Sequence, residues 1–405
     1  MKKFAEIALG VITSIGGFLE VGSLATSAQG GAEFGYQLGW AVILGSAALA
    51  FLMEAGGRLS AVTGRTLADQ MRERFGIRVF LLPLVATLLV SLLVLAAEIG
   101  GVAIALQMAT GVRAALWALP VAFLAWLLLW RGTFGIVEKG AASLGLVSIV
   151  FAIGAAALHP RWTSVAAGIV PTAPAHDGAR YWYLAISILG ASISPYLFFF
   201  YSSGAVEDKW TREHLGVNRL TAAFGNLFGG GLNLMVLVVG ALVFLPRGIH
   251  VERYEQMGMI LTPALHHPGF VFFLATLAIT CFGTTLEIAL SVAYLLAQGL
   301  GWEWSENLRP SKDSRFTATY TLLILLASIP ILAGVDLLGL TNFSMVLTAA
   351  SLPASVLPML VLMNDRDVMR QQTNGWTTNA ALIVIAAMSI VLFLAAVPLQ
   401  ILGGG

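Results

Sequence analysis

Long apolar runs recur along the whole chain and limit its fold more than any other feature. Eleven of them approach or exceed the length of about 20 residues that a helix needs to cross a bilayer. Charged residues make up only 11% of the 405 residues, too few to cover the surface of a soluble enzyme. The sequence therefore predicts an all-α polytopic membrane protein with eleven transmembrane helices, near residues 5–33, 37–57, 79–108, 114–130, 138–158, 182–204, 217–245, 269–300, 317–334, 337–363 and 376–401.

The composition excludes other classes of protein and partner. Cys281 is the only cysteine, which rules out a disulfide scaffold. The formal net charge of +1 gives no electrostatic footprint for nucleic acid. We therefore expect the lipid bilayer to surround the chain and no nucleic acid to bind it, and a monomer is the working expectation.

Basic residues fall mainly on one side of the predicted spans. If the N-terminus lies in the cytoplasm, 17 of the 22 Lys and Arg residues are in cytoplasmic segments and 5 are outside. Cytoplasmic loops of membrane proteins carry such an excess. The longest loops, near 159–181 and 246–268, are too short to hold a further domain. We expect one integral domain over residues 1–405, multi-pass in the cell (inner) membrane, with the N-terminus inside and the C-terminus outside.

Two predicted spans contain helix breakers near mid-membrane depth. The first carries Glu20 and Gly22 within its apolar run, and the sixth carries Pro195. Proline removes a backbone donor and clashes with the preceding turn. Corresponding breaks in two halves of a membrane protein are typical of transporter sites built from inverted repeats. The ordinary alternative is a simple kink at each position.

Five glutamates fall within or near the predicted spans, where an ionisable side chain is costly unless it faces a cavity or a partner. Glu54 and Glu138 lie near the span ends beside basic residues, and we interpret both as interfacial ion pairs. Glu20 lies at a break and is the strongest functional candidate. For Glu98 two interpretations stay open, an acid that supports the site and a protonated buried carboxyl. We interpret Glu287 as a partner in a structural hydrogen bond.

Several segments resemble the Nramp family of divalent-metal transporters, in register over most of the chain. They are residues 17–26, 34–36, 62–68, 97–106, 189–195, 351–358 and 364–366. The resemblance implies a LeuT-type five-plus-five inverted repeat with broken helices 1 and 6 and alternating access between the two sides of the membrane. It places repeat one at about 5–158, repeat two at about 182–363, and an extra helix at about 376–401.

The site motifs depart from the family pattern. The family's Asp-Pro-Gly-Asn is Glu-Val-Gly-Ser here, at residues 20–23. The family's Met-Pro-His is Ser-Pro-Tyr, at residues 194–196, so the thioether at the first position is absent. The resemblance implies metal binding by Glu20, Ser23, Ala191 and Ser194. It implies supporting or gating roles for Gly22, Pro195, Tyr196, Glu98 and Met345, the last at a span-10 position that is usually Gln.

The residues of this ligand set indicate which metal it suits. Sulfur donors favour softer ions, whereas an oxygen set with one carboxylate suits hard ions. Mg²⁺ fits because it keeps several waters and takes only one or two carboxylates, and Mn²⁺ would tolerate the same ligands. We therefore expect transport of Mg²⁺ or Mn²⁺ as the substrate, with no resident cofactor.

The family's proton-coupling residues are replaced as well. The first acid of span 3 aligns with Leu95, two histidines align with Tyr196 and Tyr201, and an arginine aligns near Ile324. Tyrosine, with a pKa of about 10, does not relay protons near neutral pH as histidine does. The sequence predicts weak or no proton coupling, a pattern similar to that of the Nramp-related magnesium transporters.

Two other functions stay open on the sequence. The first is a carrier of organic amines or amino acids on the same fold, with Tyr196, Phe198 and Phe199 as an aromatic wall. The second is a non-transporting sensor or scaffold that has lost its metal site, although a buried Glu20 is costly to keep without a partner. We do not expect an enzyme, since the sequence has no His-Glu-x-x-His motif and no serine nucleophile elbow.

Overall fold

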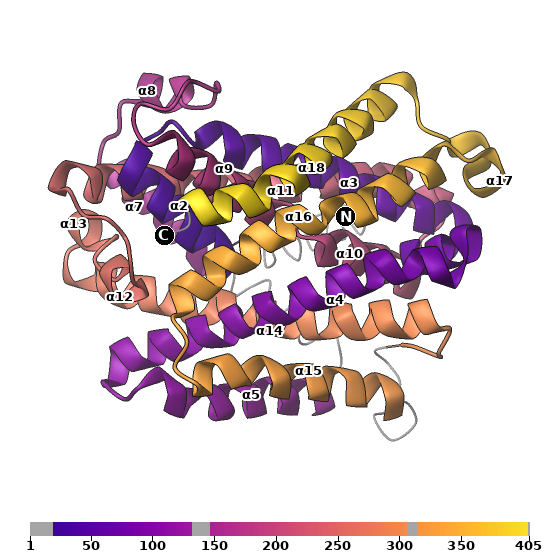
Figure 1. The fold of residues 1–405 in the computed structure, drawn as a ribbon, viewed down its shortest axis with the longest axis horizontal. Helices are drawn as coiled ribbons and strands as arrows, with labels where there is room; N and C mark the ends of the chain where they lie inside the picture. Colours follow the sequence, from indigo (N-terminus) through magenta and orange to yellow (C-terminus); the bar gives the residue numbers. More distant parts are fainter. Residues whose placement is uncertain (1–18, 132–145, 306–313, 404–405) are drawn as a thin grey trace.

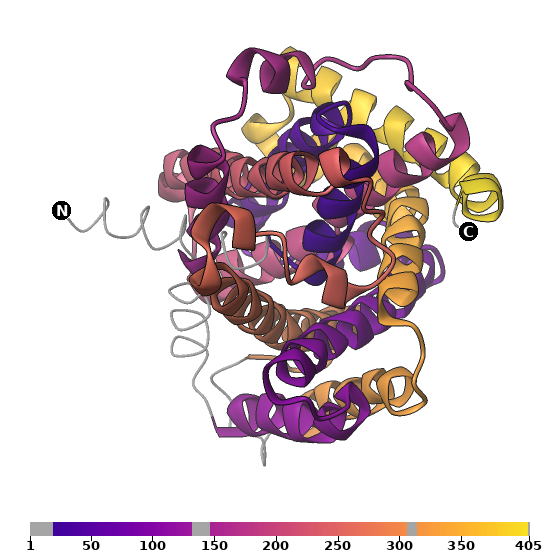
Figure 2. The same ribbon diagram turned by 90° about the vertical axis from the view of Figure 1, so that its left-hand side faces the viewer.

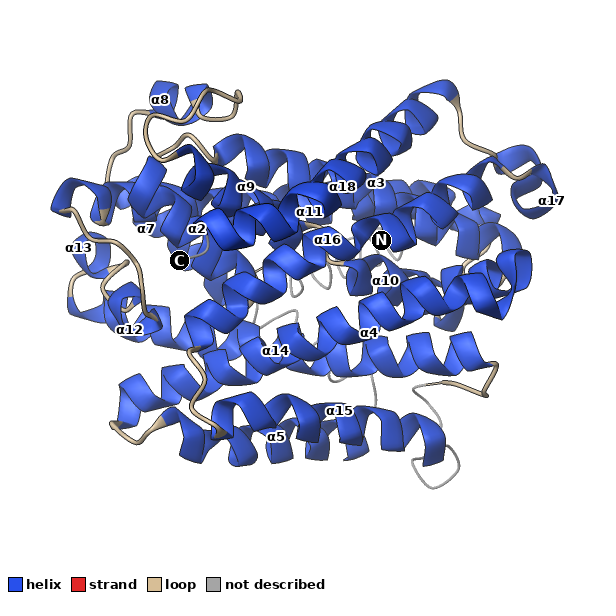
Figure 3. Cartoon of the chain, viewed as in Figure 1, coloured by secondary structure: helices blue, strands red, loops and turns tan. Residues whose placement is uncertain are grey.

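The computed structural model describes residues 19–131, 146–305 and 314–403, and these ranges contain helices and no strand (Figure 3). Nine helical segments in them are long and apolar enough to cross a membrane. They are α3 (Gly39–Thr63), α4 (Leu67–Thr110), α5 (Ala114–Arg131), α9 (Gly178–Ser192) with α10 (Pro195–Glu207), α11 (Leu215–Val243), α14 (His267–Leu300), α15 (Ser314–Leu332), α16 (Leu337–Asn364) and α18 (Trp376–Gly403) (Figure 1).

Each of these nine segments coincides with a predicted span. The remaining two predictions, near 5–33 and 138–158, fall partly outside the described ranges. Within these two spans the structure describes only α2 (Val21–Phe34) and α7 (Ile149–Ala157) as α-helices. The total of eleven transmembrane helices therefore stays a prediction. Short helices lie in the connections: α8 (Trp162–Ala167), α12 (Tyr254–Met257), α13 (Thr262–Leu265), α17 (Arg366–Met369), and the 3₁₀ turns η1 (Leu146–Ser148), η2 (Arg212–His214), η3 (Leu245–Arg247) and η4 (Arg370–Gln372).

The helices beside the two predicted breaks, α2, α9 and α10, lie at the centre of the molecule. Every residue of α2 is buried, and 94% of the apolar window of α9 and α10 is buried, against 28% for α5. In contrast, α5 and α15 pack together at one edge, where their apolar side chains are exposed (Figures 1 and 2). Burial on all sides explains why α2 tolerates polar residues that a lipid-facing helix would not carry.

Glycines allow α2 and α11 to pack closely. A Cβ atom at Gly31 would lie 2.2 Å from the carbonyl oxygen of Leu237. A Cβ atom at Gly240 would lie 2.9 Å from the carbonyl oxygen of Ala28. Close backbone approach through small residues is the usual way in which membrane helices associate. This contact holds α2 against a long spanning helix.

Ion pairs lie at both ends of the helix bundle. Glu33 at the end of α2 pairs with Arg180 at the start of α9 at 2.9 Å. At the opposite end, Arg58 of α3 pairs with Glu54 at 3.1 Å, as the sequence predicted for this glutamate. The Arg58 guanidinium also donates to the Asn374 side chain ahead of α18 at 2.8 Å. Glu138, the other glutamate interpreted as an ion-pair partner, lies outside the described residues.

Candidate metal site

The chain between α9 and α10 leaves the helical path at Ile193 and Ser194, as the sequence predicted for this span. Pro195 begins α10, where its missing N–H costs nothing. The same missing N–H removes the helical partner of the Ala191 carbonyl, four residues earlier. Pro195 therefore cannot pair with this carbonyl oxygen in the last turn of α9.

The break predicted in the first span falls at the start of α2, and the residues before Leu19 lie outside the described ranges. Glu20 is extended, with φ −74° and ψ 166°, and the helix begins at Val21. The first amides of a helix have no partner inside it and carry a partial positive charge. The Val21 N–H donates to Glu98 Oε1 of α4 at 3.0 Å. The Glu20 side chain is fully buried, so the position of the helix start fixes where its carboxyl group lies.

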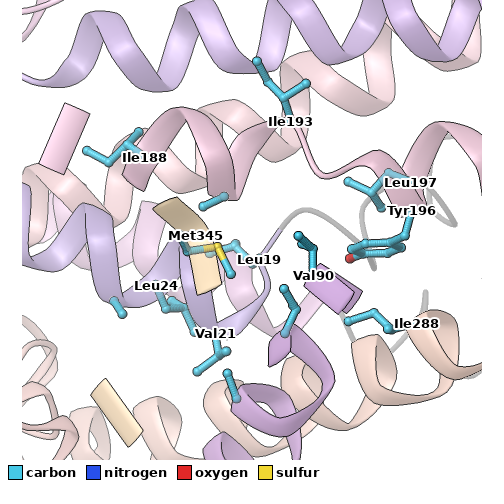
Figure 4. Packing of buried hydrophobic residues seen from close by; sticks show 14 of the residues in the cluster. Leu19, Val21, Leu24, Val90, Ile188, Ile193, Tyr196, Leu197, Ile288 and Met345 are labelled. Carbon is cyan, nitrogen blue, oxygen red and sulfur yellow. The ribbon is translucent and has the colours of Figure 1, made fainter. Parts of the chain in front are cut away.

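Tyr196 joins the two breaks. Its hydroxyl donates to Glu20 Oε2 at 3.2 Å, and its backbone oxygen accepts a hydrogen bond from Ser291 Oγ of α14 at 3.0 Å. Figure 4 shows Leu19 and Val21 at one break and Ile193 and Leu197 at the other, so the polar groups lie within an apolar shell. The first turn of α10 thus contacts both α2 and the scaffold helix α14.

The carboxyl groups of Glu20 and Glu98 each have one oxygen atom without a partner among the described residues. Glu20 Oε1 and Glu98 Oε2 are both buried and accept no hydrogen bond from the described residues. Glu287 of α14 acts electrostatically on both carboxyl groups, although nothing in the sequence placed it near them. Buried charge without a partner is strongly unfavourable, so this arrangement can be relieved by a cation or by protons.

The four residues predicted to bind the metal are all buried and occupy three adjoining pieces of chain. Glu20 precedes α2, Ser23 lies in the first turn of α2, Ala191 lies in the last turn of α9, and Ser194 lies between α9 and α10. Among the described residues, the Ser194 hydroxyl makes a single long hydrogen bond of 3.5 Å, to the Gly190 carbonyl. The described residues contain no group of three or more His, Cys, Asp or Glu side chains arranged around a metal. An ion here would therefore depend on hydroxyls, backbone carbonyls and water.

Two further residues at the site had no clear signal in the sequence. The Cys281 thiol of α14 contacts the Glu98 carboxyl group, and a Cβ at Gly101 would lie 2.6 Å from its sulfur. A lone cysteine in an apolar span is typical of plain packing, so the sequence does not indicate this contact. Ser291 bonds a backbone atom 95 residues away, and no sequence pattern predicts such a contact.

Met345 of α16 contacts both α2 and α9. A Cβ at Gly22 would lie 2.3 Å from Met345 Sδ, so the thioether occupies the space that a side chain at Gly22 would need. A Cβ at Gly190 would lie 2.0 Å from the Met345 carbonyl oxygen. Figure 4 shows the sulfur beside the start of α2. Gly22 and Met345, both predicted to support or gate the site, therefore pack directly against each other.

These features define an integral membrane protein whose buried polar centre lies between the start of α2 and the break that separates α9 from α10. The chain belongs to the Nramp family, because the family profile described as natural resistance-associated macrophage protein-like matches residues 10–397. The divalent metal cation transporter MntH of Ralstonia nicotianae is 30% identical over 92% of this chain and 85% of its own length. MntH of Deinococcus radiodurans is 26% identical over 97% and 89%.

Solved structures have the same fold. A manganese transporter of Eremococcus coleocola, in complex with an aromatic bis-isothiourea compound, superposes with a TM-score of 0.81. It is 20% identical in sequence, over 98% of this chain and 87% of that one. Mhp1, a nucleobase-cation-symport-1 family transporter, gives a TM-score of 0.66 at 15% identity, over 98% and 91%. At these identities the comparison establishes the arrangement of helices alone.

Proposed function

We propose that the chain is a secondary-type transporter of divalent metal cations in the cell (inner) membrane, working by alternating access around the two breaks. The observation that carries this proposal is Glu20, a fully buried carboxyl group at a helix break. One of its oxygens accepts a hydrogen bond from Tyr196, and the other has no partner among the described residues. Intramembrane acids in such positions serve ion pathways. The similarity to divalent metal cation transporters supports the same function.

In the proposed site, the ion is the transported substrate and Glu20 supplies its only charged ligand. Ser23 and Ser194 offer hydroxyl oxygens, and Ala191 offers a backbone carbonyl oxygen to which Pro195 cannot donate. Oxygen ligands with one carboxylate and retained water fit Mg²⁺ or Mn²⁺.

The arrangement of histidines supports weak or no proton coupling. All six lie in loops or at helix ends, away from both breaks. The tyrosine that bonds Glu20 does not titrate near neutral pH. The inverted repeat of about 5–158 and 182–363, the eleven spans and the cytoplasmic N-terminus remain part of this proposal, and the basic residues on one side support the orientation.

Uptake into liposomes tests this proposal directly. We expect the purified full chain to carry Mn²⁺ and Mg²⁺ down their gradients, with saturation and without acidifying the lumen, as measured with metal-sensitive and pH-sensitive dyes. Luminal acidification in step with uptake would contradict the uncoupled mechanism. A folded protein that carries no divalent ion would contradict transport itself and favour the sensor or scaffold.

Substitutions of Glu98 test the proposed metal site more specifically, because its carboxyl group accepts a hydrogen bond from the first amide of α2. Glu98→Gln keeps a carbonyl oxygen that can accept from Val21, and we expect it to bind Mn²⁺ within about threefold of the original affinity. Glu98→Met has no acceptor and leaves a buried N–H unpaired, which costs about 1–3 kcal/mol and should weaken binding about tenfold. Isothermal titration of the purified variants measures both. Equal losses in the two variants would show that the charge of Glu98 matters rather than its hydrogen bond.

The organic carrier has no comparable support. The Phe198 and Phe199 rings lie 5.2 Å apart and are buried against the core, and the Tyr196 hydroxyl is engaged by Glu20. These aromatic residues therefore pack the protein rather than line a wall for an organic substrate.

A further inference from the structure

A sulfur atom lies closer to the proposed site than the motif sequences indicate. Serine at position 194 removes the sulfur from the sixth span, which led to an all-oxygen prediction. In the structure, however, the Met345 thioether packs onto Gly22, the second residue of α2 and two residues from Glu20. A Cβ at Gly22 would lie 2.3 Å from its Sδ and 2.7 Å from its Cε, so the end of the side chain is at this position.

The backbone of α16 fixes where this sulfur lies. The Met345 carbonyl packs onto Gly190 of α9, so closely that no side chain fits between them. Gly190 in turn accepts the Ser194 hydroxyl. Two glycines, one on each interrupted helix, thus admit Met345 between α2 and α9, and the residue is fully buried there.

Plain packing is the common role of a buried methionine. At this position, however, the thioether lies against Gly22, two residues from Glu20, whose Oε1 is buried and has no partner in the described part of the chain. A thioether is uncharged and poorly hydrated, so it binds soft and borderline ions but gives no advantage to Mg²⁺, which requires oxygen ligands. Its flexible three-bond side chain can turn toward an ion without moving the helix.

We propose that the Met345 thioether is a metal donor that sets ion preference, favouring softer divalent ions such as Cd²⁺ over Mg²⁺. This inference rests on the proposed transport function and narrows its substrate class. The donor set becomes one carboxylate, hydroxyl and carbonyl oxygens, and one sulfur supplied by α16. The preference for a soft ion is then set by α16 and not by α2, α9 or α10.

Metal binding to the purified full chain tests this inference, with Cd²⁺, Mn²⁺ and Mg²⁺ titrated separately. Met345→Leu keeps the apolar volume and removes the sulfur. We expect it to weaken Cd²⁺ binding about tenfold, the effect of one lost donor contact of about 1.4 kcal/mol, while Mg²⁺ binding changes by less than about twofold. Met359→Leu is the matched control, because Met359 is buried on the same helix and its Cε faces Gly56 of α3 instead. This control should leave all three affinities unchanged.

Two further measurements keep the inference falsifiable if Met345→Leu folds poorly. Gly22→Ala should push the thioether aside and lower Cd²⁺ affinity in the same direction. X-ray absorption of bound Cd²⁺ should show one sulfur neighbour in the original protein and none in Met345→Leu. An unchanged ratio of Cd²⁺ to Mg²⁺ affinity in both variants, with divalent binding intact, would overturn this inference alone. Absence of any divalent binding by the original protein would instead overturn the proposed function.

Discussion

Replacing Glu20 with glutamine should abolish measurable divalent cation uptake while the protein still folds. The change removes the only charged ligand of the proposed site but keeps an oxygen that can accept the Tyr196 hydroxyl. Removing one partner of a buried charge pair costs about 3–5 kcal/mol, so metal affinity should fall a hundredfold or more. The empty protein no longer buries a lone carboxylate, so its thermal transition should stay or rise. Liposome uptake, metal titration and a melting curve measure these effects.

Two variants serve as controls for this prediction. Glu252→Gln removes an exposed carboxylate in a loop and should leave uptake unchanged. Glu20→Asp keeps the charge but shortens the side chain by one methylene, and we expect reduced rather than abolished uptake. If Glu20→Gln still carries Mn²⁺ or Mg²⁺ at the original rate, the assignment of the site to the α2 break is wrong.

The sequence predicts the parts of this structure that local physics decides. Apolar runs of bilayer length place α3, α4 and the later spanning helices, because length and hydropathy require no knowledge of neighbours. Proline chemistry places the break before Pro195 for the same reason. The pairing of Glu54 with Arg58 is also local, since the two residues are four apart on one helix.

The contacts that define the site depend instead on which helices pack together. Tyr196 and Glu20 are separated by 176 residues, and Glu98 and Val21 by 77. The family resemblance identifies most of these residues as site residues, but it does not predict their hydrogen bonds. It also implies an oxygen-only ligand set, because the motifs that carry the resemblance in the first and sixth spans contain no sulfur. The sulfur of Met345 reaches α2 only through the close approach of α16 to two glycines, which is a property of the packing.

Because of that packing, a single methyl group added at Gly190 should strongly destabilise the fold. A Cβ there would lie 2.0 Å from the Met345 carbonyl oxygen and 2.9 Å from its carbon, and a backbone cannot turn away as a side chain can. Gly190→Ala must therefore separate α9 from α16, and we expect it to destabilise the protein by about 3 kcal/mol. Adding Met345→Leu should not restore stability, because the clash is with the main chain.

A thermal-shift measurement in detergent tests this expectation against a matched substitution. Gly204→Ala places the same methyl group in α10, where no atom lies within 4 Å, and should be neutral or stabilise the helix by up to about 1 kcal/mol. The effect of Gly190→Ala should exceed that of Gly22→Ala, since at Gly22 the contact is with the flexible end of Met345 and the side chain can yield. Equal melting temperatures for the Gly190 and Gly204 variants would mean that α9 and α16 are not in backbone contact. The sulfur would then not be held between the interrupted helices, and the ion preference assigned to Met345 would lose its structural basis.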